Sequence, residues 1–91
     1  MFTIYRKVII SPDGGRDVHD TYYRSWESAK AQLDTDAETH KERGYWKPTR
    51  NVDRMNTRKG FYEYEKEFAS KVDSKLIMRL ALIDGYFSDN D

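Results

Sequence analysis

Residues 75–83 read KLIMRLALI, and the fold of this 91-residue chain depends on the state of that stretch. As a helix it would place Leu76, Ile77, Leu80 and Ile83 on one side, and Leu, Met and Ala favour helices. As a strand it would be buried on both faces at the centre of a sheet. Periodicity alone leaves both states open. Because the run is short and follows a clear strand after a hairpin-like connection at 71–74, we favour a strand.

The segments before this run predict a second hairpin. Side chains of 61–68 alternate between two sets, which is typical of a half-buried strand. Residues 50–56 are weakly strand-like, and 57–60 supplies a turn between the two segments. Pro48 argues against a central strand at that point, because proline cannot donate to the ladder.

The N-terminal third of the chain predicts another hairpin. Segment 2–10 is dense in β-branched residues, 11–15 carries Pro and Gly for a tight turn, and 16–24 reads as the returning strand. We expect one face of this hairpin to supply core residues, namely Phe2, Ile4, Val8, Ile10, Val18 and Tyr22.

Between the two hairpins the apolar residues recur at helical spacing, which predicts a helix over 26–43. Ser25 is suited to the N-cap and Gly44 to the position after the last turn. The apolar stripe of this helix is narrow and consists of Trp26, Ala29, Leu33 and Ala37.

The assembled expectation is a small α+β domain of order ββαβββ, an antiparallel sheet with one helix packed on one face. We expect the domain to span 1–87, followed by a flexible acidic tail at 88–91. One slim helix cannot cover a five-stranded sheet. We therefore expect the opposite sheet face, with candidates such as Tyr5, Ile9 and Tyr23, to be partly exposed.

Composition narrows the class of protein. Sixteen basic and sixteen acidic residues give no net charge, whereas nucleic-acid binders usually carry a basic field. Cysteine is absent, which excludes disulfides and thiolate chemistry and fits the reducing cytoplasm. The N-terminus lacks the pattern of a signal peptide, and no apolar run is long enough to cross a membrane.

The residues that could carry chemistry lack the required spacing. His19 and His40 do not form a zinc-binding pattern. The acidic run 34–38 lacks the later Gly and Glu of a calcium loop, and Gly14-Gly15 leads into a strand rather than a helix. Glu63, Glu65 and Glu67 share one strand face, where we expect solvated charges. We therefore expect no catalytic, cofactor or metal site, and no enzyme activity.

One basic segment, residues 46–62 with Lys47, Arg50, Arg54, Arg58 and Lys59, keeps single-stranded nucleic acid open as an alternative partner. Its cations are opposed only by Asp53, and Trp46, Phe61 and Tyr62 flank them, a combination that suits single strands. Lys59-Gly60-Phe61 resembles the opening of the central strand of the RNA-recognition motif. The pattern departs from that motif at Tyr62 and Glu63, and the glutamates that follow would repel phosphate.

The leading expectation is a non-enzymatic protein-interaction module, because Tyr, Trp and Arg dominate interface hot spots. In size and composition the chain resembles small accessory proteins of phages and mobile elements. Some of these inhibit host machinery, including CRISPR nucleases, so the resemblance implies an inhibitor or regulator. Self-association as a homodimer is a further possibility. The candidate partner-binding residues are Tyr5, Tyr23, Trp46, Lys47, Arg50, Arg54, Arg58, Lys59, Tyr62 and Tyr64.

Overall fold

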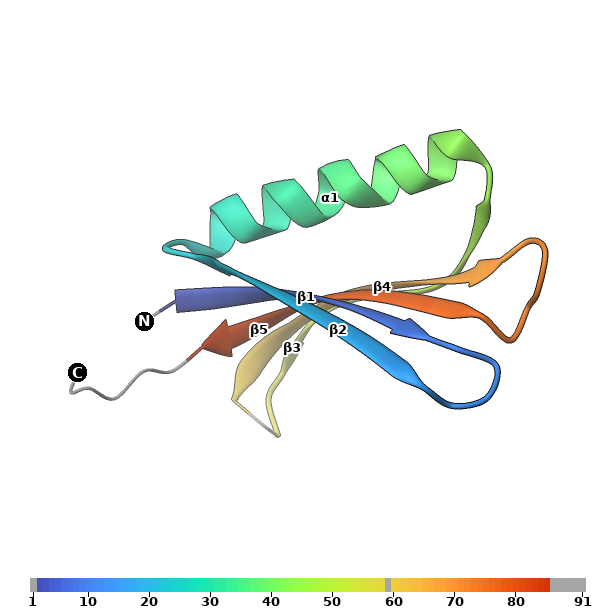
Figure 1. Cartoon of the computed structure of the whole chain (residues 1–91). Helices are drawn as coiled ribbons and strands as arrows, with labels where there is room; N and C mark the ends of the chain where they lie inside the picture. The colour runs from blue at the N-terminus through green and yellow to red at the C-terminus, as the bar shows by residue number, and fades with distance from the viewer. Residues whose placement is uncertain (1, 59, 86–91) are drawn as a thin grey trace.

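The computed structural model describes residues 2–58 and 60–85, and within them it forms five strands and one helix (Figure 1). The expected order ββαβββ and the single helix on one sheet face are confirmed. The expected tail at 88–91 and the domain end at 87 lie outside the described residues. The elements are β1 (Phe2–Ile10), β2 (Arg16–Tyr23), α1 (Trp26–Arg43), β3 (Trp46–Asn56), β4 (Phe61–Ser70) and β5 (Ile77–Gly85).

The sheet is antiparallel throughout, in the order β2-β1-β5-β4-β3. Residues 77–83 of the apolar run are therefore part of a strand, as favoured from the sequence, and β5 is the central one of the five described strands. Met78, Leu80 and Leu82 of this strand are buried. The last described strand, β5, thus joins the N-terminal hairpin to the β3–β4 hairpin.

The N-terminal hairpin forms as expected. β1 and β2 pair from Ile10↔Arg16 to Thr3↔Tyr23 without a register shift. The turn is closed by the Ser11 N–H, which donates to the Gly15 carbonyl at 2.8 Å. Gly14 adopts φ 94°, a left-handed conformation that glycine takes without a steric penalty.

The helix begins and ends at the expected residues. The Ser25 hydroxyl accepts from the Ser28 N–H at 3.1 Å, and Gly44, at φ 76°, donates its N–H to the Lys41 carbonyl at 3.2 Å. Both contacts satisfy backbone groups that a helix end leaves unpaired. Local sequence signals therefore determine the length of α1.

The edge position of β3 explains how a strand can contain Pro48. β3 pairs with β4 on one side, and the register shifts between Pro48 and Arg50. An edge strand tolerates proline because its outward N–H needs no partner in the sheet.

The expected assignment of the hairpin faces is wrong. Side chains alternate across a strand, and the odd-numbered residues of β1 face α1. Tyr5 is buried at 5% exposure, whereas Val18 and Tyr22, expected in the core, are 48% and 56% exposed. Both faces of β1 are apolar, so alternation alone did not distinguish them.

The narrow stripe of α1 explains which face is buried. Ala29, Leu33 and Ala37 are the buried residues of the helix, and two of the three are alanines. Small side chains leave space beneath the helix that large rings fill. Tyr5, Tyr64 and Phe68 enter this core, and Ile9, Tyr23, Trp26 and Trp46 pack around it.

Candidate interaction surface

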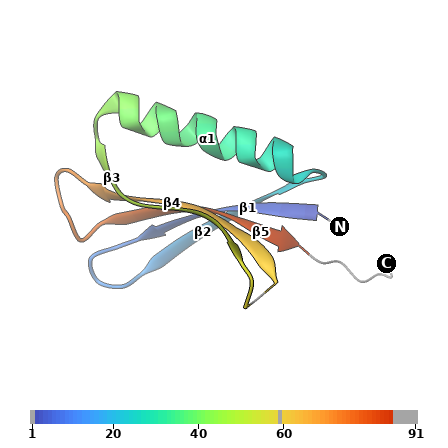
Figure 2. The same cartoon turned by 180° about the vertical axis from the view of Figure 1, so that it is seen from behind.

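The sheet face opposite α1 has no layer packed on it in the described part of the chain (Figures 1 and 2). We call it the uncovered face. The pairing register assigns to it the residues that alternate with the core residues on each strand. The face has an apolar half over β2, β1 and β5, and a charged half that crosses from β5 over β4 to β3.

The apolar half exposes large side chains that a core would normally bury. Tyr22 and Val18 project from β2, Phe2 from β1 and Ile83 from β5, with exposures of 56%, 48%, 38% and 37%. Phe61, 41% exposed, continues this surface at the start of β4. Contiguous exposed apolar area of this kind marks interaction surfaces more often than scattered single residues do.

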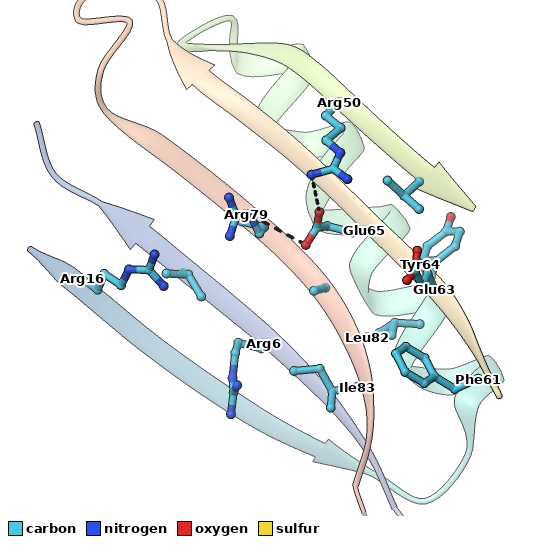
Figure 3. A pocket seen from close by; sticks show the side chains of 13 residues that line it. Arg6, Arg16, Arg50, Phe61, Glu63, Tyr64, Glu65, Arg79, Leu82 and Ile83 are labelled. Carbon is cyan, nitrogen blue, oxygen red and sulfur yellow. Dashed lines mark ion pairs between the residues drawn. The ribbon is translucent and has the colours of Figure 1, made fainter. Parts of the chain in front are cut away.

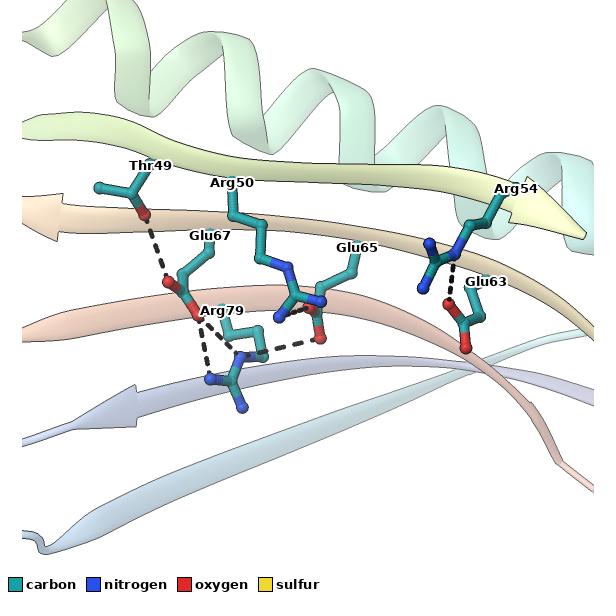
Figure 4. A network of polar contacts seen from close by, with 7 residues as sticks. All are labelled: Thr49, Arg50, Arg54, Glu63, Glu65, Glu67 and Arg79. Atoms are coloured by element: carbon teal, nitrogen blue, oxygen red, sulfur yellow. Dashed lines mark hydrogen bonds and ion pairs between the residues drawn. The ribbon is translucent and has the colours of Figure 1, made fainter. Parts of the chain in front are cut away.

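The charged half is a ladder of arginine and glutamate side chains (Figure 4). Arg79 of β5 donates to Glu67 at 2.9 Å and lies 3.7 Å from Glu65. Arg50 reaches Glu65 from the other side at 3.7 Å, and Arg54 donates to Glu63 at 3.1 Å. The expected same-face row of three glutamates is confirmed.

The ion pairs of this ladder largely neutralise the charges of the three glutamates. Their charges are matched by guanidinium groups from both neighbouring strands, as opposite-charge pairs across strands stabilise a sheet. In the described residues no cluster of three or more His, Asp or Glu side chains is arranged to hold a metal ion. The ladder therefore offers fixed, largely neutralised polar groups.

A hollow of about 440 Å³ lies on this face where the sheet curves (Figure 3). Val8 lies in its wall and is only 8% exposed, although no helix covers it. Arg6 donates two hydrogen bonds of 2.8 Å to Asp20 beside it, and this pair holds the pKa of Asp20 below its ordinary value. Arg16 lines the same hollow from the edge strand.

Two of the predicted partner-binding residues lie beneath the helix and not at the surface. Tyr5 donates to Asp36 at 2.7 Å, and Tyr64 donates to Asp34. Burial first, then these hydrogen bonds, raises the pKa of both tyrosines. The expectation that Tyr5 is exposed is wrong, and Tyr64, at 5% exposure, is equally inaccessible to a partner.

The carboxyl of Asp34 also receives Lys30, which donates at 2.9 Å. Burial opposes the charge on Asp34, but the hydrogen bonds from Tyr64 and Lys30 outweigh it, so its pKa is lowered. The two tyrosines therefore tie α1 to the sheet through carboxylate groups, and a hydrogen bond to an ionised carboxylate such as that of Asp34 is stronger than a neutral one.

The other predicted aromatic residues also lie on the helix side. Tyr23 and Trp46 are partly buried and pack against the core. Tyr62 is 36% exposed, donates to Asp53 and packs in a T-shaped arrangement with the Trp26 ring at 5.5 Å between centroids. None of these rings belongs to the uncovered face.

The predicted basic residues do not gather around those rings. Arg50 and Arg54 lie on the uncovered face in the ladder, while Lys47 and Arg58 are exposed on β3 and in the turn after it. Lys59 lies outside the described residues. The sheet thus separates Trp46 and Tyr62 from the two ladder arginines, so the 46–62 segment does not form one aromatic and basic surface.

The residues that form the uncovered face include several that were not among the predicted partner-binding residues: Tyr22, Phe61, Arg79 and Ile83. Two signals in the sequence indicate that this face, and not the opposite one, is the side of the sheet that α1 leaves uncovered. Arg6 interrupts the even-numbered side of β1, where it meets Asp20, and the acidic residues Asp34 and Asp36 flank the helix stripe as possible acceptors for buried tyrosines.

The chain was compared with protein families, curated proteins and solved structures, and none of the three comparisons finds a match. Among the described residues, no helix has both the length and the apolar character that crossing a bilayer requires.

Proposed function

We propose that this protein is a non-enzymatic interaction module that binds a protein partner through its uncovered face. The observation that carries the proposal is the exposure of Tyr22, Val18 and Ile83 on a sheet face beside the ladder. Burying that apolar area against a partner would stabilise the complex by roughly 25 cal/mol for each Å² removed from water. The ordered strands beneath it hold the contact side chains in place before binding.

The face indicates the chemistry of the partner. Its apolar half suits a partner surface that offers aliphatic or aromatic side chains. The ladder at its side offers N–H and carboxylate groups already held in position, which a partner can engage with little loss of side-chain entropy. We therefore propose a folded protein with an apolar patch bordered by charges of both signs.

The finer proposal is an inhibitor or regulator that acts by occluding the partner surface, as small phage or mobile-element proteins do. The cysteine-free composition is consistent with action in the reducing cytoplasm. Occlusion requires shape, exposed apolar area and fixed charges, and the uncovered face supplies all three.

Affinity capture with matched variants tests this proposal. The tagged full chain serves as bait in a lysate of the organism that carries its gene, alongside Tyr22→Ala and Ile83→Lys. Tyr45→Ala and Val72→Lys are the controls, because both side chains are exposed, at 68% and 92%, and lie in connections outside the face.

We expect the same protein to be retained by the wild type and the controls. With the purified partner, each face variant should bind about tenfold more weakly or worse, as for a hot-spot residue. A partner that binds the face variants and the wild type equally would refute the assignment of the surface.

Single-stranded nucleic acid is the competing partner. A labelled oligonucleotide at low salt measures it directly, with Arg58→Ala as the variant, because Arg58 lies in the exposed turn of the basic segment. Salt-dependent binding that is weakened by Arg58→Ala and unaffected by Tyr22→Ala would favour the nucleic-acid function over the protein partner.

A further inference from the structure

The two edges of the sheet differ in how they are protected. β3, at one edge, contains Pro48 and a register irregularity, which discourage further pairing. β2, at the other edge, contains neither proline nor lysine, and its register with β1 is unbroken. β2 is also the most exposed strand of the sheet, since only Asp20 and Tyr23 are partly buried. The outer edge of β2 can therefore accept another strand.

The charges of β2 select one way in which a second copy can pair. In a two-fold antiparallel pair, a central residue faces itself and its neighbours face across. Centring on Val18 sets Arg16 opposite Asp20 and Asp17 opposite His19, each twice. Centring on Asp20 or His19 sets two like side chains against each other, and centring on Thr21 joins no opposite charges.

We propose that the chain forms a two-fold homodimer in which β2 pairs with β2 of a second copy, centred on Val18. The five strands of each copy then form one continuous ten-stranded sheet. The uncovered faces of the two copies join side by side, because the Val18 side chains point to that face. The dimer thus doubles the area available to a partner.

The side chains at the edge are suited to these contacts. No ion pair engages Arg16 within the described residues, so its guanidinium is available to the second copy. Arg6 donates one hydrogen bond to each oxygen of Asp20, and a carboxylate has further acceptor sites. Asp17 and His19 already lie within 3.2 Å on one face and can exchange partners across the two-fold axis.

The first measurement is the mass of the full chain by sedimentation over a range of concentrations. We expect a reversible species of 21.6 kDa, twice the 10.8 kDa of one chain. A monomer at every concentration overturns the proposal.

The register is tested by single cysteines, because the chain has none of its own. Under mild oxidation Val18→Cys should form a disulfide-linked dimer, since facing residues of paired strands lie within disulfide range. His19→Cys and Thr21→Cys test two of the competing registers, and Val72→Cys reports random collisions. Linkage through position 19 or 21 in preference to 18 overturns the register.

Charge exchange tests the same contacts without oxidation. Arg16→Glu sets two carboxylates opposite each other on both sides of the axis, and we expect the dimer Kd to rise roughly tenfold. Asp20→Lys does the same with two cations. A mixture of the two variants should restore the dimer, because each repulsion is replaced by an attraction.

Circular dichroism of each variant monitors folding, since Asp20→Lys also removes the Arg6 pair. If the mixture of two folded variants stays monomeric, the proposed pairing is wrong. This outcome is distinct from failure of the proposed function: Tyr22→Ala and Ile83→Lys report on partner binding, whereas these experiments report only on the mass of the chain alone.

Discussion

At the scale of single residues, two tyrosines account for the orientation of the sheet. Tyr5 on β1 donates a hydrogen bond to Asp36 of α1, and Tyr64 on β4 donates one to Asp34. Their rings fill the space under the alanines of α1, and their hydroxyl groups are satisfied by carboxylates. A buried phenol needs such a partner, because an unpaired hydroxyl in the core is costly.

We expect Tyr64→Phe to lower the free energy of unfolding by about 1–2 kcal/mol, because it removes a hydrogen bond to an ionised group and keeps the ring. Urea denaturation measures the change. Tyr45→Phe is the control, since Tyr45 is 68% exposed. An equal effect of both substitutions would show that the bond to Asp34 contributes no stability.

The same tyrosines predict that the free energy of unfolding falls at alkaline pH. Burial and the hydrogen bonds to Asp36 and Asp34 raise the pKa of Tyr5 and Tyr64 in the folded state. The unfolded chain loses these protons near pH 10 while the folded chain retains them. Rising pH therefore favours unfolding, by up to about 1.4 kcal/mol per pH unit for each tyrosine.

Urea denaturation between about pH 8 and 11 checks this expectation, because that range brackets the pKa of an unperturbed tyrosine. The double variant Tyr5→Phe with Tyr64→Phe should show a shallower decline than the wild type, and Tyr45→Phe should not. An unchanged slope in the double variant would mean that other groups cause the alkaline loss.

At the scale of elements, α1 has one large side chain, Leu33, that is fully buried against the sheet. Leu33 has no exposed area and is flanked by Ala29 and Ala37. The caps at Ser25 and Gly44 determine where the helix starts and stops, but packing provides most helix stability in proteins. The burial of Leu33 in the core with Tyr5, Tyr64 and Phe68 therefore contributes strongly to the docking of α1.

Leu33→Ala should lower the free energy of unfolding by about 2–5 kcal/mol, because it leaves a cavity under the helix. This is a large part of the stability of a domain of this size. Glu38→Ala, on the exposed side of α1, should change it by less than about 0.5 kcal/mol. Thermal or urea unfolding distinguishes the two; a mild effect of Leu33→Ala would mean that the core collapses around the gap.

At the scale of the whole molecule, the uncovered face is not uniformly exposed. Val8 and Val18 face each other across β1 and β2, yet Val8 is 8% exposed and Val18 48%. The sheet curves, so the wall of the hollow is shielded and the edge strand is open (Figure 3). The centre of this face therefore contributes to stability, and its edge remains available for contacts.

The pair Val8→Thr and Val18→Thr measures this difference with one chemical change. Burying a hydroxyl without a partner should make Val8→Thr about 1–3 kcal/mol less stable. Val18→Thr should change the free energy of unfolding by less than about 0.5 kcal/mol. Urea denaturation at low protein concentration, where the chain is monomeric, gives both values; equal losses would contradict the shielding of Val8.

The elements were predictable and the faces were not. Caps, turn residues and alternation are local signals, so the helix, both hairpins and the strand character of 77–83 followed from them. The candidate surface was predicted only in part: Arg50 and Arg54 lie on the uncovered face, whereas Tyr5 and Tyr64 lie in the core. The register between distant strands decides this, and no short segment encodes it.

The sequence by itself determined the order of the elements, the length of α1 and the absence of recognised catalytic spacings. Only the tertiary structure decided which side of the sheet is buried. The physical reason is that both faces of β1 are apolar, so hydrophobicity does not choose between them. The fit of tyrosine rings under a helix of small residues, with Asp34 and Asp36 to receive their hydroxyls, makes that choice. The same choice leaves Tyr22, Val18 and Ile83 exposed on the other side, where we place the interaction surface.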